Sequence, residues 1–252
     1  MEWVVWRYRR GRMPTPRSAE PALHGKTGVV LCWDIDGTLL TTARAGIGAW
    51  EQALLETLGK TLGLGALPTA GLTDVEIGRL LIERLGAGSE PTLLGSLLAR
   101  YEALLPLRLH DRKGKVLPGV WEFLEWNREH DRVPCILLTG NTRAGAAAKL
   151  RHYGLSGFFS DGAFASLEDP DRVAVARKAV GIASGLQGEG FVPERMVVIG
   201  DTPHDVNCGR AVGARTLAVA TGTYGVAELD AAGAWRTLEA IPEPQAFLRF
   251  LK

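Results

Sequence analysis

The sequence lacks any excess of charge of one sign, any long hydrophobic run and any dense set of cysteines. Its 29 Lys and Arg residues against 28 Asp and Glu give a net charge of +1, so no overall field favours nucleic acid or a membrane surface as a partner. No apolar stretch reaches the roughly 18 residues that a membrane span requires, and no signal-peptide pattern opens the chain. Cys32, Cys135 and Cys208 are too few and too widely spaced for a disulfide framework. We therefore predict a cytoplasmic protein with reduced cysteines.

Two further absences narrow the chemistry. No Gly-x-Ser-x-Gly sequence occurs, which argues against a serine hydrolase. The five histidines are scattered and no Cys-x-x-Cys pair is present, so a zinc site has no ligands at suitable spacing. We interpret His204, which lies between two acidic residues, as part of the rim of a site. What remains, 46% hydrophobic and 23% charged residues, is typical of a globular domain with a sizeable core.

Residues 1–27 differ in character from the rest of the chain. They hold six basic and two acidic residues, and three prolines interrupt any periodic pattern. We predict a basic, disordered tail. An interaction arm that uses Trp3 and Trp6 is the alternative.

From residue 28 onward, short apolar runs alternate with helical patterns. This alternation is typical of βαβ units, in which helices cover both faces of a parallel sheet. The runs that we predict as strands are Val29–Trp33, Cys135–Leu138, Met196–Ile199 and Thr216–Ala220. The sequence therefore predicts a Rossmann-like, three-layer α/β/α core.

Between Leu40 and Pro118 the strand pattern gives way to helical patterning rich in Leu and Ala. The helical segments are Ala49–Leu58, Val75–Leu85 and Thr92–Leu104, and we expect turns at Gly71, Pro91, Pro106, Pro118 and Gly119. We predict that residues 43–117 form a small all-helical cap inserted after the first strand. Residues 28–42 and 118–252 then form the core.

Polar residues follow three of the predicted strands directly. These clusters are Asp34-Ile35-Asp36, Thr139-Gly140-Asn141 and Gly200-Asp201, with Asp205 shortly after the last. Because the carboxyl ends of parallel strands meet at one edge of a sheet, we expect the clusters to converge. Four carboxylates repel one another unless a divalent cation neutralises them, and oxygen ligands suit Mg²⁺. The clusters therefore predict a magnesium site and, with it, phosphate chemistry.

The spacing suggests a role for each side chain. Asp34, at a strand end, is the candidate nucleophile, and Asp36 is the candidate general acid and base. Thr139, Gly140 and Asn141 offer donors for phosphoryl oxygens. Either Arg172 or Lys178 can supply a cation.

This ordered set of motifs resembles the haloacid dehalogenase-like phosphohydrolases, in particular their phosphoglycolate-phosphatase-like branch, over about residues 28 to 250. The resemblance implies a phosphorylated Asp34, an acid/base Asp36 and a phosphate-binding Thr139. It also implies that Mg²⁺ is held by Asp34, the Asp36 carbonyl, Asp201 and Asp205.

The resemblance extends to the helical insert, which takes the place of that family's cap. Gly71-Leu72-Thr73-Asp74 resembles a cap loop that faces the site, so Thr73 and Asp74 are candidate substrate contacts beside Gly140 and Asn141, and Arg44 is a further one. The usual Lys-Pro form of the third motif is absent. The segment that ends in Asp171-Arg172 resembles a variant with arginine at a helix start, which favours Arg172 over Lys178.

We therefore predict a Mg²⁺-dependent phosphatase that acts on a small phosphorylated metabolite, as a monomer or homodimer. The alternatives are a phosphomutase that uses the same phospho-aspartate, and a non-catalytic module that binds a phosphometabolite. A carbon–halogen hydrolase has no use for Asp36. A phosphonate hydrolase needs a cap lysine, and Lys60 is the one candidate, without a supporting motif.

Overall fold

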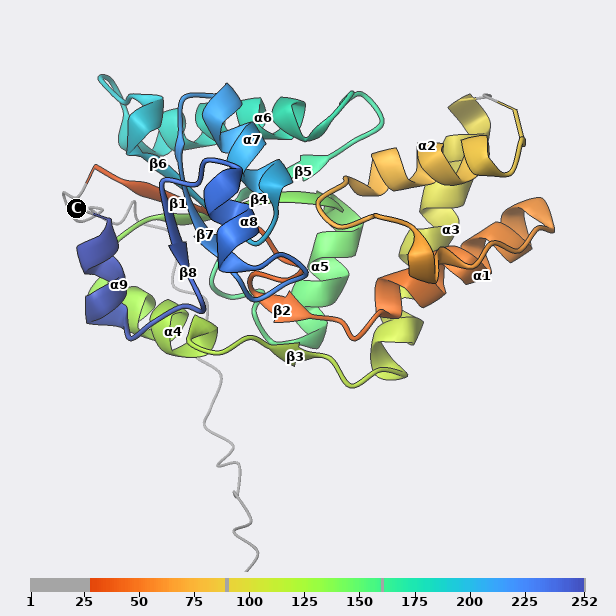
Figure 1. Cartoon of the computed structure of the whole chain (residues 1–252), viewed down its shortest axis with the longest axis horizontal. Coiled ribbons are helices and arrows are strands. Elements are labelled where there is room, and N and C mark those ends of the chain that lie inside the picture. The colour runs from red at the N-terminus through yellow and green to blue at the C-terminus, as the bar shows by residue number, and fades with distance from the viewer. Residues whose placement is uncertain (1–27, 89–90, 160, 252) are drawn as a thin grey trace, which may run out of the picture.

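A parallel β-sheet forms the centre of the molecule (Figure 1). The computed structural model describes residues 28–88, 91–159 and 161–251; the predicted tail, residues 1–27, lies outside them. Within these ranges the sheet has six strands in the order β5-β4-β1-β6-β7-β8. The strands are β1 (Val30–Trp33), β4 (Cys135–Thr142), β5 (Gly162–Ala165), β6 (Met196–Gly200), β7 (Arg215–Val219) and β8 (Arg236–Leu238). Strand β1 lies between β4 and β6, so its carboxyl end opens at the point where a sheet of this kind binds ligands.

Helices cover both faces of the sheet, which confirms the predicted fold class. The helices of this core are α4 (Val120–His130), α5 (Arg143–His152), α6 (Arg172–Gln187), α7 (Pro203–Ala211), α8 (Val226–Ala231) and α9 (Pro244–Phe250), with a 3₁₀ turn η2 (Pro193–Arg195). Side chains of β1 alternate between two apolar clusters: Cys32 packs toward α6 and α7, and Trp33 packs toward α4 and α9. The Trp33 ring lies 5.5 Å from Phe123 and 6.0 Å from Phe247. Burial on both faces explains why the central strands read as unbroken apolar runs.

The helical insertion lies between two short strands, β2 (Leu40–Thr41) and β3 (Lys115–Val116), which pair antiparallel at its base. It contains α1 (Ala45–Leu58), η1 (Leu64–Ala66), α2 (Asp74–Arg84) and α3 (Pro91–His110). Helices α1 and α3 pack together through stacked rings of Trp50 and Tyr101, 4.1 Å apart. The insertion sits beside the carboxyl edge of the sheet, as expected of a cap (Figure 1). No helix in the described ranges is long and apolar enough to cross a membrane.

The expected turn at Pro106 is wrong, because Pro106 lies inside α3. A proline in a helix interior removes one hydrogen bond and costs about 3 kcal/mol. On either side of it, Tyr101, Leu104, Leu105 and Leu109 are almost completely buried. Each large apolar side chain stabilises the fold by about 1.5–3 kcal/mol when it is buried, so packing outweighs the local penalty and the helix continues.

Candidate active site

Asp34 and Asp36 lie at the carboxyl end of β1 in a tight loop. The Asp34 amide donates to the Ile199 carbonyl at 2.9 Å, which continues the sheet by one residue. Beyond it, the Gly37 amide donates to the Leu40 carbonyl at 2.8 Å, and Gly37 takes a positive φ of 81° that favours glycine. The turn leaves Asp34 buried and exposes 42% of the Asp36 side chain. The two carboxylates therefore sit at different depths at the same strand end.

Asp34, Asp201 and Asp205 form a buried acidic cluster, in which one oxygen of each carboxylate lies within 4.8 Å of the others. Burial raises the pKa of Asp34 to about 6, although Arg172 works in the opposite direction. Burial, with Asp205 and Asp34 nearby, raises the pKa of Asp201 well above its ordinary value. The cluster therefore holds negative charge at a cost, which a bound cation would relieve.

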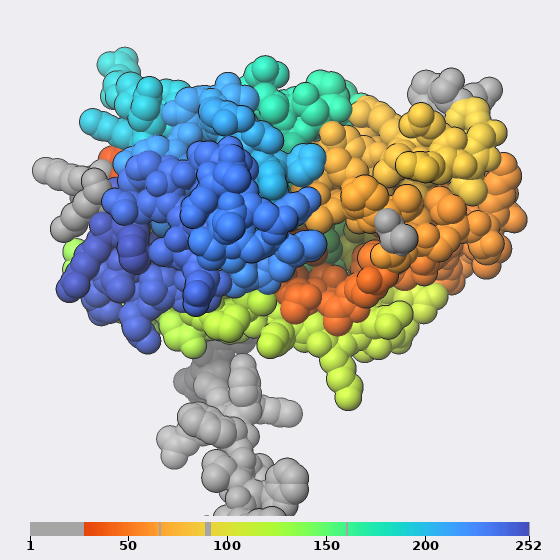
Figure 2. All heavy atoms as spheres, viewed as in Figure 1, coloured from red at the N-terminus to blue at the C-terminus, as the bar shows by residue number. Residues whose placement is uncertain are grey.

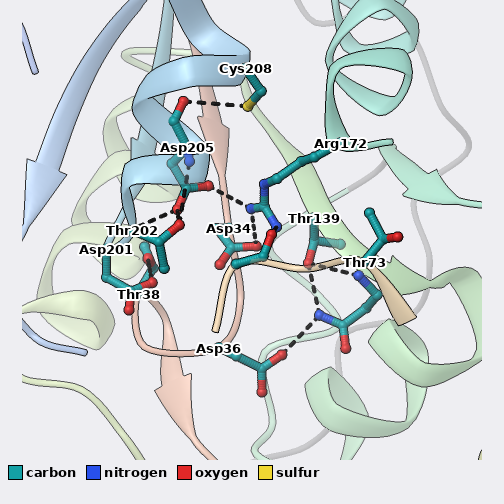
Figure 3. Close-up of polar contacts among 12 residues, drawn as sticks. Asp34, Asp36, Thr38, Thr73, Thr139, Arg172, Asp201, Thr202, Asp205 and Cys208 are labelled. Carbon is teal, nitrogen blue, oxygen red and sulfur yellow. Dashed lines mark hydrogen bonds and ion pairs between the residues drawn. The ribbon is translucent and has the colours of Figure 1, made fainter. Parts of the chain in front are cut away.

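Arg172 is the cation that lies within this cluster (Figure 3). Its Nη2 atom lies 2.9 Å from Asp34 Oδ1 and 2.5 Å from Asp205 Oδ1. Burial opposes the charge on Arg172, but Asp205 and Asp34 raise its pKa well above the ordinary value. Asp171 caps α6 by accepting from the Ala174 amide at 2.9 Å, so the helix begins with Arg172 facing the site.

Lys178, the other candidate cation, lies elsewhere. Its Nζ atom pairs with Asp169 at 2.6 Å and donates to Ser166 at 3.2 Å, and 43% of its side chain is exposed. The structure thus brings Arg172, and not Lys178, to the carboxylate of Asp34.

Thr139 and Asn141, at the end of β4, lie beside Asp34 and Asp36. The Thr139 side chain is fully buried, and its hydroxyl oxygen accepts from Asn141 Nδ2 at 2.8 Å. The same amide nitrogen donates to Asp36 Oδ2 at 2.9 Å. The Asn141 amide therefore links the polar clusters that follow β1 and β4.

Gly140 is where the insertion presses directly on the core. A Cβ atom at this position would lie 2.9 Å from Arg172 Nη1, from the Leu72 carbonyl oxygen and from the Thr73 Cα. Only glycine lets the cap loop approach the strand end this closely. Thr73 itself is the N-cap of α2, where its hydroxyl accepts from the Glu76 amide at 3.1 Å, and it does not line the cavity.

A cavity of about 400 Å³ lies between the insertion and the core, where the molecular surface is hollowed in Figure 2. Its lining includes the core residues Asp34, Asp36, Gly140, Asn141, Lys149, Arg172, Asp201 and Thr202, and the insertion residues Arg44, Ile47, Trp50, Leu64, Gly71, Leu72, Asp74 and Ile77. One wall is thus polar and charged and the other is largely apolar. The volume suits a small molecule. His204 packs beside it, close to Gly71, in agreement with a rim position.

Lys149 was not singled out from the sequence, although its side chain is only 5% exposed and lines the cavity. It lies on α5, eight residues after Asn141. Burial opposes its charge, but Asp36 and Asp74 raise its pKa. Two helical turns after a strand-end motif is a weak signal, because most lysines on helices face solvent.

Asp74 carries the cap's charge into the core. Its Oδ2 accepts from the Thr142 amide at 2.8 Å, and burial raises its pKa to about 6 from 3.8. Because the folded pKa is the higher one, this group favours folding below about pH 4 and that contribution is lost as the pH rises through 6, a total of about 3 kcal/mol. We expect Asp74→Asn to flatten the fall in unfolding free energy between pH 5 and pH 7, as measured by urea denaturation. An unchanged pH slope would contradict this prediction.

The donor set fits a divalent cation. Carboxylate oxygens are hard ligands that suit Mg²⁺, and five carboxylates surround two buried cations, Arg172 and Lys149, among the described residues of the cavity. The carboxylates are Asp34, Asp36, Asp74, Asp201 and Asp205. Asp205 is the most engaged of the acidic cluster, because Oδ1 accepts from Arg172 and Oδ2 accepts from the Thr202 amide and hydroxyl.

Gly222 gives a test of this acidic pocket. A Cβ atom there would lie 1.7 Å from Asp201 Oδ2, so the carboxylate would have to move. We expect Gly222→Ala to weaken the apparent affinity for Mg²⁺ about tenfold or more, read from the thermal shift that Mg²⁺ produces. Gly181→Ala, where an added Cβ meets nothing within 4 Å, is the matched control. Equal Mg²⁺ responses in the two variants would show that Asp201 does not hold the ion.

Comparison with known proteins agrees with this geometry. The family model of haloacid dehalogenase-like hydrolases matches residues 31–210, and the chain belongs to this family. No curated protein matches the chain significantly.

Solved structures share the fold at low sequence identity. A family IA hydrolase from Entamoeba histolytica covers 88% of this chain and 99% of its own, with a TM-score of 0.69 and 15% identity. A predicted phosphoglycolate phosphatase from Haemophilus somnus has a TM-score of 0.66 and 13% identity, over 90% and 100% of the chains. A candidate β-phosphoglucomutase from Thermotoga maritima has a TM-score of 0.59 and 22% identity, over 88% and 99%.

Proposed function

We propose that this protein is a Mg²⁺-dependent phosphatase that hydrolyses a small phosphate monoester through a phospho-aspartate on Asp34. The observation that carries the proposal is the pairing of Asp34 with the Arg172 guanidinium at 2.9 Å, at the floor of a small cavity that Asp36 also lines. The helical segment of residues 43–117 acts as the cap over the core of residues 28–42 and 118–252. Closed over the cavity, it keeps bulk water from the reacting groups.

The first half of the reaction transfers the phosphoryl group to the protein. A carboxylate oxygen of Asp34 attacks phosphorus, the bond from phosphorus to the ester oxygen breaks, and Asp36 gives a proton to the departing alcohol. Arg172, the Thr139 hydroxyl and backbone amides of the β4 end stabilise the charge on the phosphoryl oxygens. Asp34, Asp201, Asp205 and the Asp36 carbonyl are the groups that would hold Mg²⁺, whose positive charge offsets that of the phosphoryl group.

The second half of the reaction returns the protein to its starting state. A water molecule attacks the phosphorus of phospho-Asp34, and Asp36 accepts the proton that the water loses. The acyl phosphate bond breaks, which releases inorganic phosphate and restores the Asp34 carboxylate. The net reaction consumes one water for each ester cleaved.

Arg44 favours a substrate with a second anionic group, as in phosphoglycolate. Its side chain lines the cavity and is exposed, and no carboxylate within the described residues pairs with it. Ala43 and Arg44 also take positive φ angles of 48° and 69°, which are strained for residues other than glycine and are typical of functional sites. Asn141, Thr73 and Asp74 are the remaining substrate contacts that we propose.

Phosphate release from a panel of small phosphate esters, phosphoglycolate among them, tests this function. We expect release with Mg²⁺ and none with EDTA. A phosphomutase is the second candidate, favoured by the shared fold of the Thermotoga maritima protein. It would convert a sugar phosphate into its isomer with little release of phosphate, which ³¹P NMR distinguishes. Metal-dependent binding of phosphate esters without either reaction would indicate a non-catalytic module.

A further inference from the structure

A closed triangle of hydrogen bonds holds one oxygen of Asp36. Lys149 Nζ donates to Asp36 Oδ2 at 2.5 Å and to Asn141 Oδ1 at 2.5 Å. Asn141 Nδ2 closes the triangle by donating to the same Asp36 Oδ2 at 2.9 Å. Three side chains from β4, α5 and the β1 loop therefore fix one another, and two donors converge on a single carboxylate oxygen.

The other oxygen of Asp36 faces a different environment. Among the described residues, Oδ1 receives no hydrogen bond, while Oδ2 has two donors. The Asp36 side chain is 42% exposed and lines the cavity, whereas the Lys149 side chain is only 5% exposed. The triangle thus lies beneath Asp36 and leaves Oδ1 on the cavity side.

A buried lysine is costly for a fold, so its presence calls for a partner that needs it. Burying the ammonium of Lys149 on a helix that otherwise presents Ala146 and Leu150 to the core sacrifices apolar packing. Lys149 has no other hydrogen-bond acceptor in the described part of the chain than Asp36 and Asn141. The arrangement therefore serves the geometry of Asp36.

We propose that Lys149, acting with Asn141, is a positioning residue that binds Oδ2 of Asp36 and so turns Oδ1 toward the ester oxygen of the substrate. The proposal rests on the proposed phosphatase function, because it assigns the proton transfer of Asp36 to one oxygen. The competing explanation is structural: Lys149 does no more than balance the charge of the buried carboxylates. The two explanations differ in how the loss of Lys149 depends on the leaving group.

The test compares Lys149→Met with wild type on two esters. An alkyl phosphate needs a proton on its leaving oxygen, whereas p-nitrophenyl phosphate expels nitrophenolate without one. For the alkyl ester we expect kcat to fall about 100-fold or more with little change in KM, the usual size of a general-acid contribution. For p-nitrophenyl phosphate we expect a rapid burst of about one nitrophenolate per active site, followed by slow turnover, because the attacking water still needs Asp36.

Three further variants guard the interpretation. Asp36→Asn should reproduce the pattern, and Lys149→Arg should restore part of the alkyl-ester rate. Lys178→Met removes another lysine–carboxylate pair of 2.6 Å, outside the cavity, and should behave as wild type. If Lys149→Met does not fold, Asn141→Leu removes the second donor to Oδ2 and should show the same pattern in weaker form.

Each outcome decides one of the two proposals. An equal loss with both esters and no burst, in a folded Lys149→Met protein, would overturn the positioning role and leave the phosphatase function intact. Absence of metal-dependent turnover by the wild-type protein on either ester would count against the phosphatase function itself, and the positioning role would fall with it.

Discussion

Replacing Asp34 with asparagine is expected to lower turnover by about 10³-fold or more, because the amide is not a nucleophile toward phosphorus. The change keeps the side-chain size and removes one buried negative charge, so the variant should remain folded. Wild-type protein mixed with a labelled phosphate ester should yield a phosphoprotein that loses its label to hydroxylamine, as acyl phosphates do. Asp34→Asn should yield none.

Asp111→Asn is the matched control for this change. Asp111 follows α3, where 60% of its side chain is exposed and its contact is Arg108 at 3.4 Å. The same chemical substitution there should leave turnover within about twofold of wild type. Retention of more than a tenth of the wild-type rate by Asp34→Asn would show that another group accepts the phosphoryl group.

Replacing Arg172 with methionine is expected to affect both activity and stability. The change leaves Asp34 and Asp205 buried without their partner, and breaking a buried ion pair costs about 3–5 kcal/mol. We expect this loss in urea denaturation without divalent cations, and partial recovery when Mg²⁺ is added. Turnover should fall about 100-fold or more, because a donor to the phosphoryl oxygens is lost.

Lys178→Met is the comparison that makes the Arg172 result specific. The Lys178 pair with Asp169 is half-exposed on the lysine side, so its loss should cost less than about 1 kcal/mol. Turnover should stay close to wild type. The reverse order of effects, with Lys178→Met the more damaging, would show that the basic residue of this site was assigned wrongly.

Sequence alone predicted the centre of this molecule well. β1, β4, β6 and β7 are apolar because both faces of each strand are covered, and such runs can be identified without knowing their neighbours. The carboxyl ends of parallel strands share one edge, so the sequence also predicts that Asp34, Thr139 and Asp201 converge. The edge strands β5 and β8 were missed, since they are four and three residues long and carry little apolar signal.

Tertiary structure decided which residues complete the site. A basic residue on a helix has no sequence mark for the face it occupies, so the packing of α6 alone distinguishes Arg172 from Lys178. Lys149 reaches Asp36 across 113 positions of sequence, and the cap loop meets Gly140 through a contact with no local pattern. Local periodicity records burial and strand ends, because these depend on neighbouring residues. The pairing of charges across the cavity depends on how distant segments pack, and only the folded chain determines that.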